Sequence, residues 1–400
     1  MTAEVVHTAI ALPAYAHSQD SIRDALVAWL VGDPDKAAKA ASIIANGEVQ
    51  RRYTVRPLDW YLTHTSVTER SRVYADEMVA LCERAAREAL AGAGVGPADV
   101  AMILTSSCTG VMIPSVETFL VERMGLRPDI RRMPATEMGC VAGAWALGRA
   151  NDYLRAYPRS AVLVVAAELA SLTAQVTDRS MANIVSAALF GDGAAATVLV
   201  GPRFPRSGHR AGRTAERWRE ANTKRPRGPE TAQPRSERGE ASTAEAQAIR
   251  AGGRARPARI LASRSHLFPG TPELMGFDLT DSGLKIVLSP RVPRFIRQHL
   301  PAVLASFLEE QGVGRGDLKH FLLHPGGRKV LEGLERELQL TREDTRFSWR
   351  VLREYGNLSS ATVLAILHHF EQEARPEPGD LGLLMAVGPG FCAELVLLQW

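Results

Sequence analysis

Three apolar runs recur along the chain without the alternation that marks a half-exposed strand. They are VAMILTSS, which ends at Ser107, SAVLVVAAEL, which ends at Leu169, and HFLLHP, which ends at Pro325. Continuous apolar runs of this length are typical of strands that helices cover on both faces. The pattern therefore predicts a layered α/β architecture.

The chain also contains an internal repeat. REALAGAGVGPADVAMILTSS resembles SFLEEQGVGRGDLKHFLLHPG, since each has a helical run, then GVGxxD, then an apolar strand. MGCVAGAWALGRANDYL and YGNLSSATVLAILHHF match as a glycine, a thiol or polar residue, and small residues that open an apolar helix. GDGAAATVLVGP and GDLGLLMAVGPG each suggest an apolar strand that closes its half. Three matches in the same order predict a duplicated α/β unit.

Aligned positions of the two halves carry different chemistry. Cys140 corresponds to Asn357, and we expect each in the first turn of its helix. With nearly the same spacing, His324 corresponds to Ser106, each at a strand end. If the halves pack around a pseudo-twofold axis, helix starts and strand ends converge on one central site. The repeat therefore predicts that Cys140, His324 and Asn357 lie together.

These three side chains suit nucleophilic catalysis. A thiol attacks as the thiolate, and a helix N-terminus and a neighbouring imidazolium both lower its pKa. Asn357 can donate two N–H groups to an oxyanion or an enolate without titrating. Taken singly, a cysteine is more often a small buried side chain, His324 could be a plain loop histidine, and Asn357 a helix N-cap. Their complementary types at matching positions favour the catalytic interpretation.

Composition fits an ordinary globular protein with two core-sized units. The 400 residues are 46% hydrophobic and 23% charged. The N-terminus lacks a basic segment followed by an apolar core, and no apolar run reaches about 18 residues, so we expect a cytoplasmic protein. The four cysteines lie far apart with no CxxC pair, which argues against a zinc site and a disulfide framework.

The net charge of +4 comes with an uneven distribution of arginine. Pro202–Arg259 is rich in Arg, Gly, Pro, Glu and Ser and poor in aliphatic residues, which predicts a disordered surface insert. Glutamates run through it and aromatic residues do not interleave, which favours a linker over a nucleic-acid-binding element. The expected organisation is an N-terminal half (1–201) with the thiol, the insert (202–259), and a C-terminal half (260–400) with the histidine and asparagine.

The motifs SCTGVMIPS, MGCVAGA, ALFGDGAAA, LLHPGG, YGNLSSATV and VGPGFCAELVLLQW together resemble those of the type III polyketide synthases, the chalcone-synthase-like enzymes. The resemblance covers the whole chain except the insert. It implies a thiolase-like duplicated α/β/α/β/α layered fold with a disordered Arg-rich insert, a homodimer, and acyl-CoA and malonyl-CoA as substrates. It implies no metal and no cofactor. Cys140 would be the acylated nucleophile, and His324 and Asn357 would promote decarboxylation and stabilise the enolate.

The resemblance also assigns residues to a reaction cavity. Phe190 matches a gatekeeper between a coenzyme A tunnel and that cavity, while Ile286 replaces a second phenylalanine gatekeeper of the plant enzymes. The other positions assigned to the cavity are Cys108, Thr109, Thr173, Ser359, Gly388, Pro389 and Gly390. Lys39 aligns best with a basic position for coenzyme A phosphates, and its neighbours in that set appear as Ser42 and Asn46. The remaining candidates for this role are Lys36, Arg51 and Arg52.

The function expected from this resemblance is iterative decarboxylative Claisen condensation. Malonyl-CoA would extend a fatty acyl starter held on Cys140, giving alkylpyrone or alkylresorcinol-like products. One rival enzyme uses malonyl-CoA as its own starter and releases a polyhydroxynaphthalene. Another is ketoacyl carrier-protein synthase III, against which VGPG and ALFGDGAAA argue. A non-enzymatic rival, a nucleic-acid-tethered scaffold, rests on the Arg-rich insert alone.

Overall fold

The computed structural model describes residues 2–63, 66–205 and 255–400, and the predicted insert lies almost entirely outside them. A nine-stranded sheet runs through the described chain in the order β11-β12-β13-β8-β1-β7-β6-β4-β5. Its strands are β1 (Glu4–Ala11), β4 (Val100–Ser107), β5 (Arg131–Thr136), β6 (Ala161–Leu169), β7 (Asp192–Val200), β8 (Ala258–Leu267), β11 (Leu318–Leu323), β12 (Leu381–Gly388) and β13 (Cys392–Gln399). Two small sheets pair β2 (Tyr15–Ser18) with β3 (Arg51–Thr54) and β9 (Met275–Thr280) with β10 (Gly283–Leu288).

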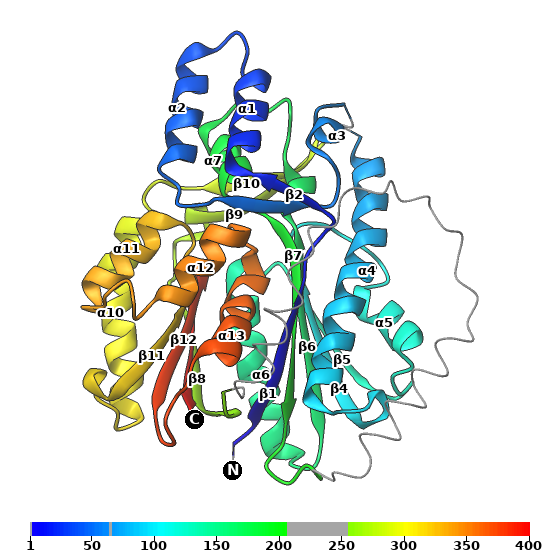
Figure 1. Cartoon of the computed structure of the whole chain (residues 1–400), viewed down its shortest axis with the longest axis vertical. Coiled ribbons are helices and arrows are strands. Elements are labelled where there is room, and N and C mark those ends of the chain that lie inside the picture. The colour runs from blue at the N-terminus through cyan, green and yellow to red at the C-terminus, as the bar shows by residue number, and fades with distance from the viewer. Residues whose placement is uncertain (1, 64–65, 206–254) are drawn as a thin grey trace.

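Helices cover both faces of the main sheet (Figure 1). The helices are α1 (Gln19–Trp29), α2 (Pro34–Ala45), α3 (Leu58–Thr63), α4 (Val67–Ala93), α5 (Val116–Met124), α6 (Ala142–Ala156), α7 (Met181–Leu189), α10 (Val292–Glu310), α11 (Arg328–Glu337), α12 (Arg346–Tyr355) and α13 (Thr362–Glu373). Short 3₁₀ turns are η1 (Pro97–Asp99), η2 (Gly139–Val141), η3 (Ala170–Thr173), η4 (Pro272–Leu274), η5 (Arg315–Asp317) and η6 (Ser359–Ala361). None of the helices in the described ranges is long and apolar enough to cross a bilayer.

The three largest hydrophobic cores of the described residues separate five layers. The central core joins α6 and α13 to apolar residues from both halves of the sheet, such as Val164 of β6 and Leu384 of β12. A second core lies between α4, α5 and the N-terminal half, and a third lies between α10, α11 and the C-terminal half. The layers follow in the order helices, N-terminal half-sheet, central helix pair, C-terminal half-sheet and helices. This order confirms the predicted α/β/α/β/α layering.

The first match of the repeat holds in three dimensions. In both halves a 3₁₀ turn leads into a buried parallel strand, η1 into β4 and η5 into β11. The aspartate of each GVGxxD motif closes its turn by accepting a hydrogen bond from a backbone N–H: Gly96 N donates to Asp99 at 3.3 Å, and Gly314 N to Asp317 at 2.7 Å. The shared glycine and aspartate therefore close the same 3₁₀ turn in each half.

The second match needs a different register from the one that the sequence indicates. Gly139 (φ 57°) and Ser359 (φ 47°) each begin the 3₁₀ turn before the central helix of their half, so they are structural counterparts. Cys140 then corresponds to Ser360, and Asn357 precedes η6 by two residues instead of lying in its first turn. Asn357 lies there because its backbone pairs with Phe190 in an isolated parallel bridge.

The third match is also shifted. GDLGLLMAVGPG forms β12, which pairs in parallel with β11 as β6 pairs with β4. The strand that closes the second half is β13, which runs antiparallel to β12 as β7 runs antiparallel to β6. Both strands are mostly apolar, so composition alone does not distinguish them.

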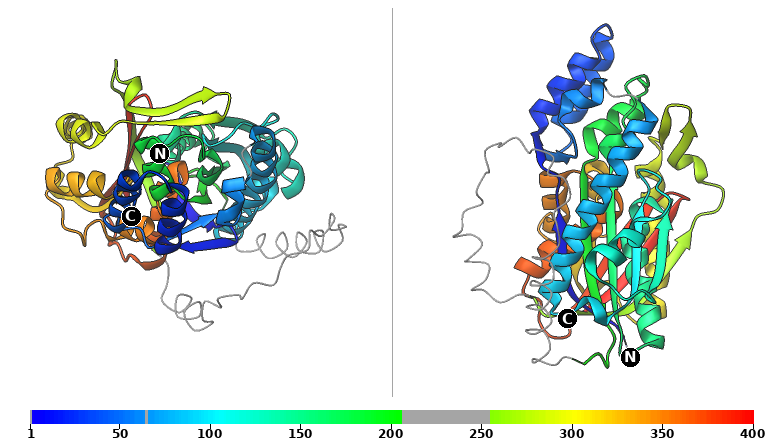
Figure 2. Two further views of the ribbon diagram at one scale, coloured as in Figure 1. Left: turned by 90° about the horizontal axis from the view of Figure 1, so that it is seen from above. Right: turned by 90° about the vertical axis from the view of Figure 1, so that its right-hand side faces the viewer.

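Around this body, α1 and α2 stand at one end of the molecule, and the β9–β10 hairpin stands out at one side (Figure 2). Helix α2 packs against α1 and α7, and β10 packs against α7 and η3. Helix α7 ends at Leu189, immediately before Phe190. These outer elements thus surround the region in which the repeat places its functional side chains.

Candidate active site

Cys140 lies in η2, at the junction with α6, and its side chain is buried. The chain approaches this point closely from the second half. A Cβ on Gly143, in the first turn of α6, would meet the carbonyl oxygen of Ser360 at 2.4 Å. A Cβ on Gly388 would meet the backbone nitrogen of Cys140 at 3.4 Å. The small residues of GCVAGA therefore let the second half of the chain pack directly against the cysteine.

His324 directly follows β11 and continues its pairing, because its backbone N–H donates to Met385 O at 2.8 Å. The imidazole is buried, and neither ring nitrogen has a hydrogen-bond partner among the described residues. A buried imidazole without partners is unusual in a stable protein and indicates a group kept available for a ligand.

Asn357 is also buried, and its amide group is oriented by its neighbours. Its Oδ1 accepts hydrogen bonds from Ser359 N at 2.7 Å and from the Thr362 hydroxyl at 3.3 Å. Because the oxygen is occupied, the NH₂ group is the part left to donate. The Asn357 side chain lowers the pKa of the Cys140 thiol by hydrogen bonding, which places that donor at the sulfur.

A backbone bridge joins Asn357 to Phe190. Asn357 N donates to Leu189 O at 2.9 Å, and Gly191 N donates to Asn357 O at 3.0 Å. A Cβ on Gly191 would meet Tyr355 O at 2.4 Å, which explains why glycine follows the phenylalanine in ALFGDG. The bridge fixes Phe190, from the first half, beside Asn357, from the second.

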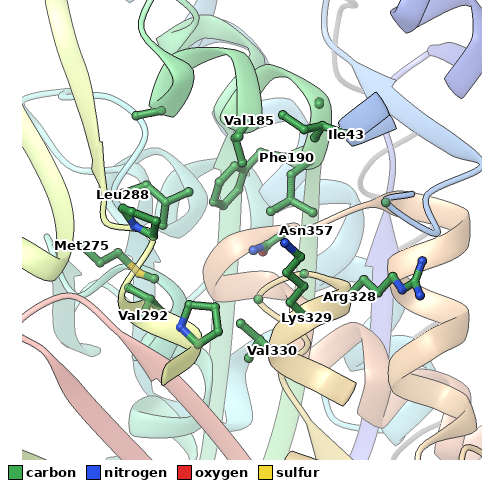
Figure 3. Close-up of a pocket in the computed structure, with 18 of the residues that line it drawn as sticks. Ile43, Val185, Phe190, Met275, Leu288, Val292, Arg328, Lys329, Val330 and Asn357 are labelled. Carbon is green, nitrogen blue, oxygen red and sulfur yellow. The ribbon is translucent and has the colours of Figure 1, made fainter. Parts of the chain in front are cut away.

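Cys140, His324, Asn357 and Phe190 line one cavity of about 680 Å³ (Figure 3). The repeat and the family motifs predict this convergence, and the structure brings the four residues together. The other lining residues come mainly from α2, α7, α10 and the start of α11, and most are apolar. The cavity is large enough for an extended apolar or neutral ligand whose reactive end reaches Cys140.

A smaller cavity, of about 30 Å³, lies on another side of the same cysteine. Besides Cys140 and Phe190 it is lined by the predicted cavity residues Cys108, Thr109, Thr173, Ile286, Ser359 and Pro389. The hydroxyl of Ser359 lies 3.6 Å from the Cys140 sulfur and 3.7 Å from that of Cys108. Gly388 and Gly390 flank Pro389, and Gly390 has a φ of 128° that favours glycine.

Burial dominates the titration of the two central groups. It raises the pKa of the Cys140 thiol to about 12, although side-chain hydrogen bonds with Ser359 and Asn357 act in the opposite direction. It lowers the pKa of His324 to about 3. The expectation that a helix start and an imidazolium lower the pKa of this thiol is thus not met, because removal from water outweighs both effects.

Glu168 is a functional candidate that the sequence analysis missed. The carboxylate is fully buried at the end of β6 and accepts hydrogen bonds from Cys108 N (3.0 Å), the Thr109 hydroxyl (2.9 Å) and the Ser360 hydroxyl (2.6 Å). It therefore ties the SSCTG loop of the first half to η6 of the second. One signal was present in the sequence, since Glu168 is the charged residue in an otherwise apolar strand.

The four basic residues proposed for coenzyme A do not line the large cavity. Lys36 pairs with Asp33 at 3.1 Å in the first turn of α2, and Arg51 is exposed on β3. Arg52 is buried and donates to the carbonyl oxygens of Ala187 and Phe190, so it supports the end of α7. Lys39 is exposed on α2, one turn from lining residue Ser42. The charged lining residues, Arg328, Lys329 and Glu332, were not anticipated.

Comparison with known proteins identifies relatives along the whole chain. Residues 6–203 match the family model "Chalcone and stilbene synthases, N-terminal domain", and residues 259–400 match the corresponding C-terminal domain. A 1,3,6,8-tetrahydroxynaphthalene synthase of Streptomyces peucetius is 35% identical over 99% of this chain and 92% of its own. The "Alpha-pyrone synthesis polyketide synthase-like Pks18" of Mycobacterium tuberculosis is 27% identical over 93% of this chain and 85% of its own.

A solved structure agrees with these matches. The crystal structure of 1,3,6,8-tetrahydroxynaphthalene synthase from Streptomyces coelicolor, described as a bacterial type III polyketide synthase, superimposes with a TM-score of 0.82. The two chains are 28% identical, and the alignment covers 99% of each.

Proposed function

The chain belongs to the chalcone and stilbene synthase family of type III polyketide synthases, and from this premise we propose that it extends a fatty acyl-CoA starter with malonyl-CoA through a thioester on Cys140. The family membership makes the protein an acyltransferase. The observation that carries the proposal is the cavity in which Cys140, His324 and Asn357 meet. Its products would be alkylpyrones or alkylresorcinol-like compounds.

The proposed cycle begins with transfer of the acyl group. The Cys140 sulfur attacks the acyl-CoA thioester, the bond to the coenzyme A sulfur breaks, and the thiol proton reaches the departing thiolate by way of His324. Malonyl-CoA then loses carbon dioxide, and the electron pair of the broken C–C bond becomes an enolate. The enolate carbon attacks the acyl carbon and expels Cys140, which gives a β-ketoacyl-CoA that can load again.

Two features of the site support the roles of His324 and Asn357. Asn357, whose NH₂ group is directed at the Cys140 sulfur, and His324, whose ring nitrogens are unpartnered among the described residues, both line the large cavity. Donors that are fixed before substrate arrives stabilise a developing enolate oxygen without a cost of reorganisation. Because burial keeps His324 neutral at pH 7, one ring nitrogen carries a hydrogen and can donate to that oxygen.

The apolar lining of the large cavity, which also has to take the neutral pantetheine arm of the thioester, supports a fatty starter. Ile43, Val185, Met275, Leu288 and Ile296 contribute to it. Apolar surface of this kind stabilises an alkyl chain in proportion to the area removed from water.

A malonyl-primed synthase is the second candidate, and a specific observation favours it. The cavity of about 30 Å³ that also borders Cys140 is too small for a long alkyl chain. The name of the Streptomyces peucetius relative points in the same direction. In this candidate malonyl-CoA would serve as both starter and extender, and the product would be a polyhydroxynaphthalene.

Product analysis separates the two candidates. Purified enzyme would receive malonyl-CoA alone, and then malonyl-CoA with acyl-CoA starters of increasing chain length, with products identified by mass spectrometry. The proposal expects products only when an acyl-CoA is present, with masses that follow the starter. An aromatic product from malonyl-CoA alone would overturn the fatty starter.

The Cys140→Ala variant tests the site itself. It should form no condensation product, because no thioester can be made, yet it should still release carbon dioxide from malonyl-CoA, since that step is assigned to His324 and Asn357. Condensation by Cys140→Ala would contradict the mechanism in both candidates.

A further inference from the structure

The outer part of the large cavity has two facing walls. Ser42, Ile43, Asn46 and Gly47, at the end of α2, line one wall, and the start of α11 lines the other. Among the described residues that line the cavity, the charged side chains are Arg328, Lys329 and Glu332, and all three belong to α11. Positive charge is therefore confined to one end of an otherwise apolar and neutral cavity.

Arg328 holds the two walls together. Its Nε donates to Glu332 at 2.7 Å, and its guanidinium also donates to Asn46 O at 3.3 Å. The side chain is thus bound to a carboxylate of its own helix and to the backbone at the end of α2. The Glu332 carboxylate compensates its charge, and its hydrogen bond to Asn46 O connects α11 to the end of α2.

Lys329 differs from its neighbour. It is exposed, and it forms no hydrogen bond or ion pair with any residue in the described ranges. In Figure 3 the Lys329 side chain extends from the start of α11 across the pocket, whereas Arg328 points away. An uncompensated ammonium group therefore borders a cavity whose other end holds Cys140.

The facing wall carries a second cation near the same place. Lys39 lies three residues before Ser42 and seven before Asn46 on α2, so the three share one helix face. Ser42 and Asn46 line the cavity, and Lys39 continues that face one turn further out. No ion pair or hydrogen bond of the Lys39 side chain occurs within the described part of the chain.

We propose that Lys329 binds the phosphate groups of coenzyme A thioesters from the α11 wall, opposite Lys39. This inference rests on the proposed use of such thioesters. Their pantetheine arm is neutral and suits the apolar interior, while their nucleotide end carries phosphates that require cations. The family resemblance assigns basic positions on α2 to that end, and two of those positions are Ser42 and Asn46 here. Lys329 thus supplies from α11 the charge that α2 lacks.

Isothermal titration calorimetry with two probes tests this assignment. Coenzyme A carries the phosphates, and pantetheine carries the same arm without them. Lys329→Ala should weaken coenzyme A binding about tenfold and leave pantetheine binding unchanged, because one charge-assisted contact to phosphate is lost. Lys329→Arg should retain most of the affinity, and the difference between wild type and Lys329→Ala should shrink as salt is added.

Lys319→Ala is the matched control, since Lys319 is an exposed lysine at the other end of β11 from His324. It should bind both probes as the wild type does. Equal affinity of wild type and Lys329→Ala for coenzyme A would overturn the inference. An equal loss of affinity for coenzyme A and for pantetheine would also overturn it, because the lysine would then act on the pantetheine arm or on the shape of the cavity.

The same titrations distinguish this inference from the proposed function. If the wild type bound neither probe, the use of coenzyme A thioesters would itself fail. If the wild type bound coenzyme A and Lys329→Ala bound it equally well, only the role of Lys329 would fail.

Discussion

Cys140 and His324 are two groups that burial keeps neutral when each is considered alone. The thiol has a pKa raised to about 12, and the imidazole has one lowered to about 3. An isolated thiolate or an isolated imidazolium is unfavourable here because each would lack both water and a counter-charge. Transfer of the proton from sulfur to imidazole would create opposite charges at once on two groups that line the same cavity. The two residues should therefore titrate as a pair.

Alkylation of Cys140 measures this coupling. Replacing His324 with glutamine removes the proton acceptor while filling similar space, so His324→Gln should react with iodoacetamide at least about tenfold more slowly at pH 7. In that variant the rate should keep rising from pH 7 to pH 9, because a thiol with a raised pKa is still mostly protonated there. Mass spectrometry of the peptide that contains Cys140 gives the rates.

Cys82 is the internal control for this experiment, because it is a buried thiol in α4 that should stay unlabelled while the protein is folded. Equal labelling of Cys140 in wild type and His324→Gln would show that the thiol ionises without the imidazole.

The functional residues differ in how far the sequence determines them. Cys140 and His324 could be predicted because a glycine-flanked thiol before small residues and a histidine at a strand end have recognisable neighbours. Arg52 could not, since burial of a cation against the carbonyl oxygens of α7 depends on how a separate helix packs. Lys329 was missed for a related reason. Its proposed role depends on the cavity that it lines together with the end of α2, and no local pattern reveals that packing.

Among the elements, the contact between α6 and η6 tolerates no side chain at Gly143. A Cβ there would lie 2.4 Å from the backbone oxygen of Ser360, and backbone cannot move aside as a flexible side chain can. Gly143→Ala should therefore lower the free energy of unfolding by about 2 kcal/mol or more, by the overpacking that such contacts cause. It should also reduce condensation, because η2 carries Cys140. Urea unfolding and product formation measure the two effects.

Gly333→Ala is the matched substitution in α11. Its Cβ would lie 3.5 Å from the Arg297 side chain, an ordinary contact, so the better helix propensity of alanine should raise stability by about 0.5 to 1 kcal/mol. If both variants changed stability in the same direction, helix propensity rather than close packing would govern Gly143.

The elements themselves were largely predictable, and their register was not. Apolar runs identified β4, β6 and β11, and the GVGxxD motif identified the turns before two of them. The alignment of Cys140 with Asn357 failed because Gly356–Leu358 forms a bridge to Phe190 before η6 begins. A pattern of apolar residues is insensitive to a few residues added between two helices, so only the packed structure fixes that register.

For the molecule as a whole, Glu394 makes stability depend on pH. Its side chain is 3% exposed within β13, and burial raises its pKa to about 7. The folded state therefore holds this proton more tightly than the unfolded state, whose value is 4.5. The free energy of unfolding then falls as the pH rises from about 4.5 to 7, since the unfolded state releases the proton over this range while the folded state must keep it or carry a buried charge.

Glu394→Gln should remove that dependence. The variant should be more stable than the wild type by about 1 to 2 kcal/mol at pH 8, and the difference should vanish near pH 4.5. Urea unfolding at both values measures it. Glu337→Gln, at an exposed position of α11, should leave the free energy of unfolding unchanged at both pH values. A constant difference between Glu394→Gln and wild type at the two pH values would show that ionisation is not its cause.

The position of β13 bears on how the enzyme is made. This strand comes last in the sequence, yet it lies between β12 and β8 and joins the C-terminal strands to the rest of the sheet. During translation, β13 must therefore emerge from the ribosome before the two halves of the sheet can close around Cys140. We therefore expect a nascent chain that lacks β13 to contain Cys140 but not the assembled site that would load it with an acyl group.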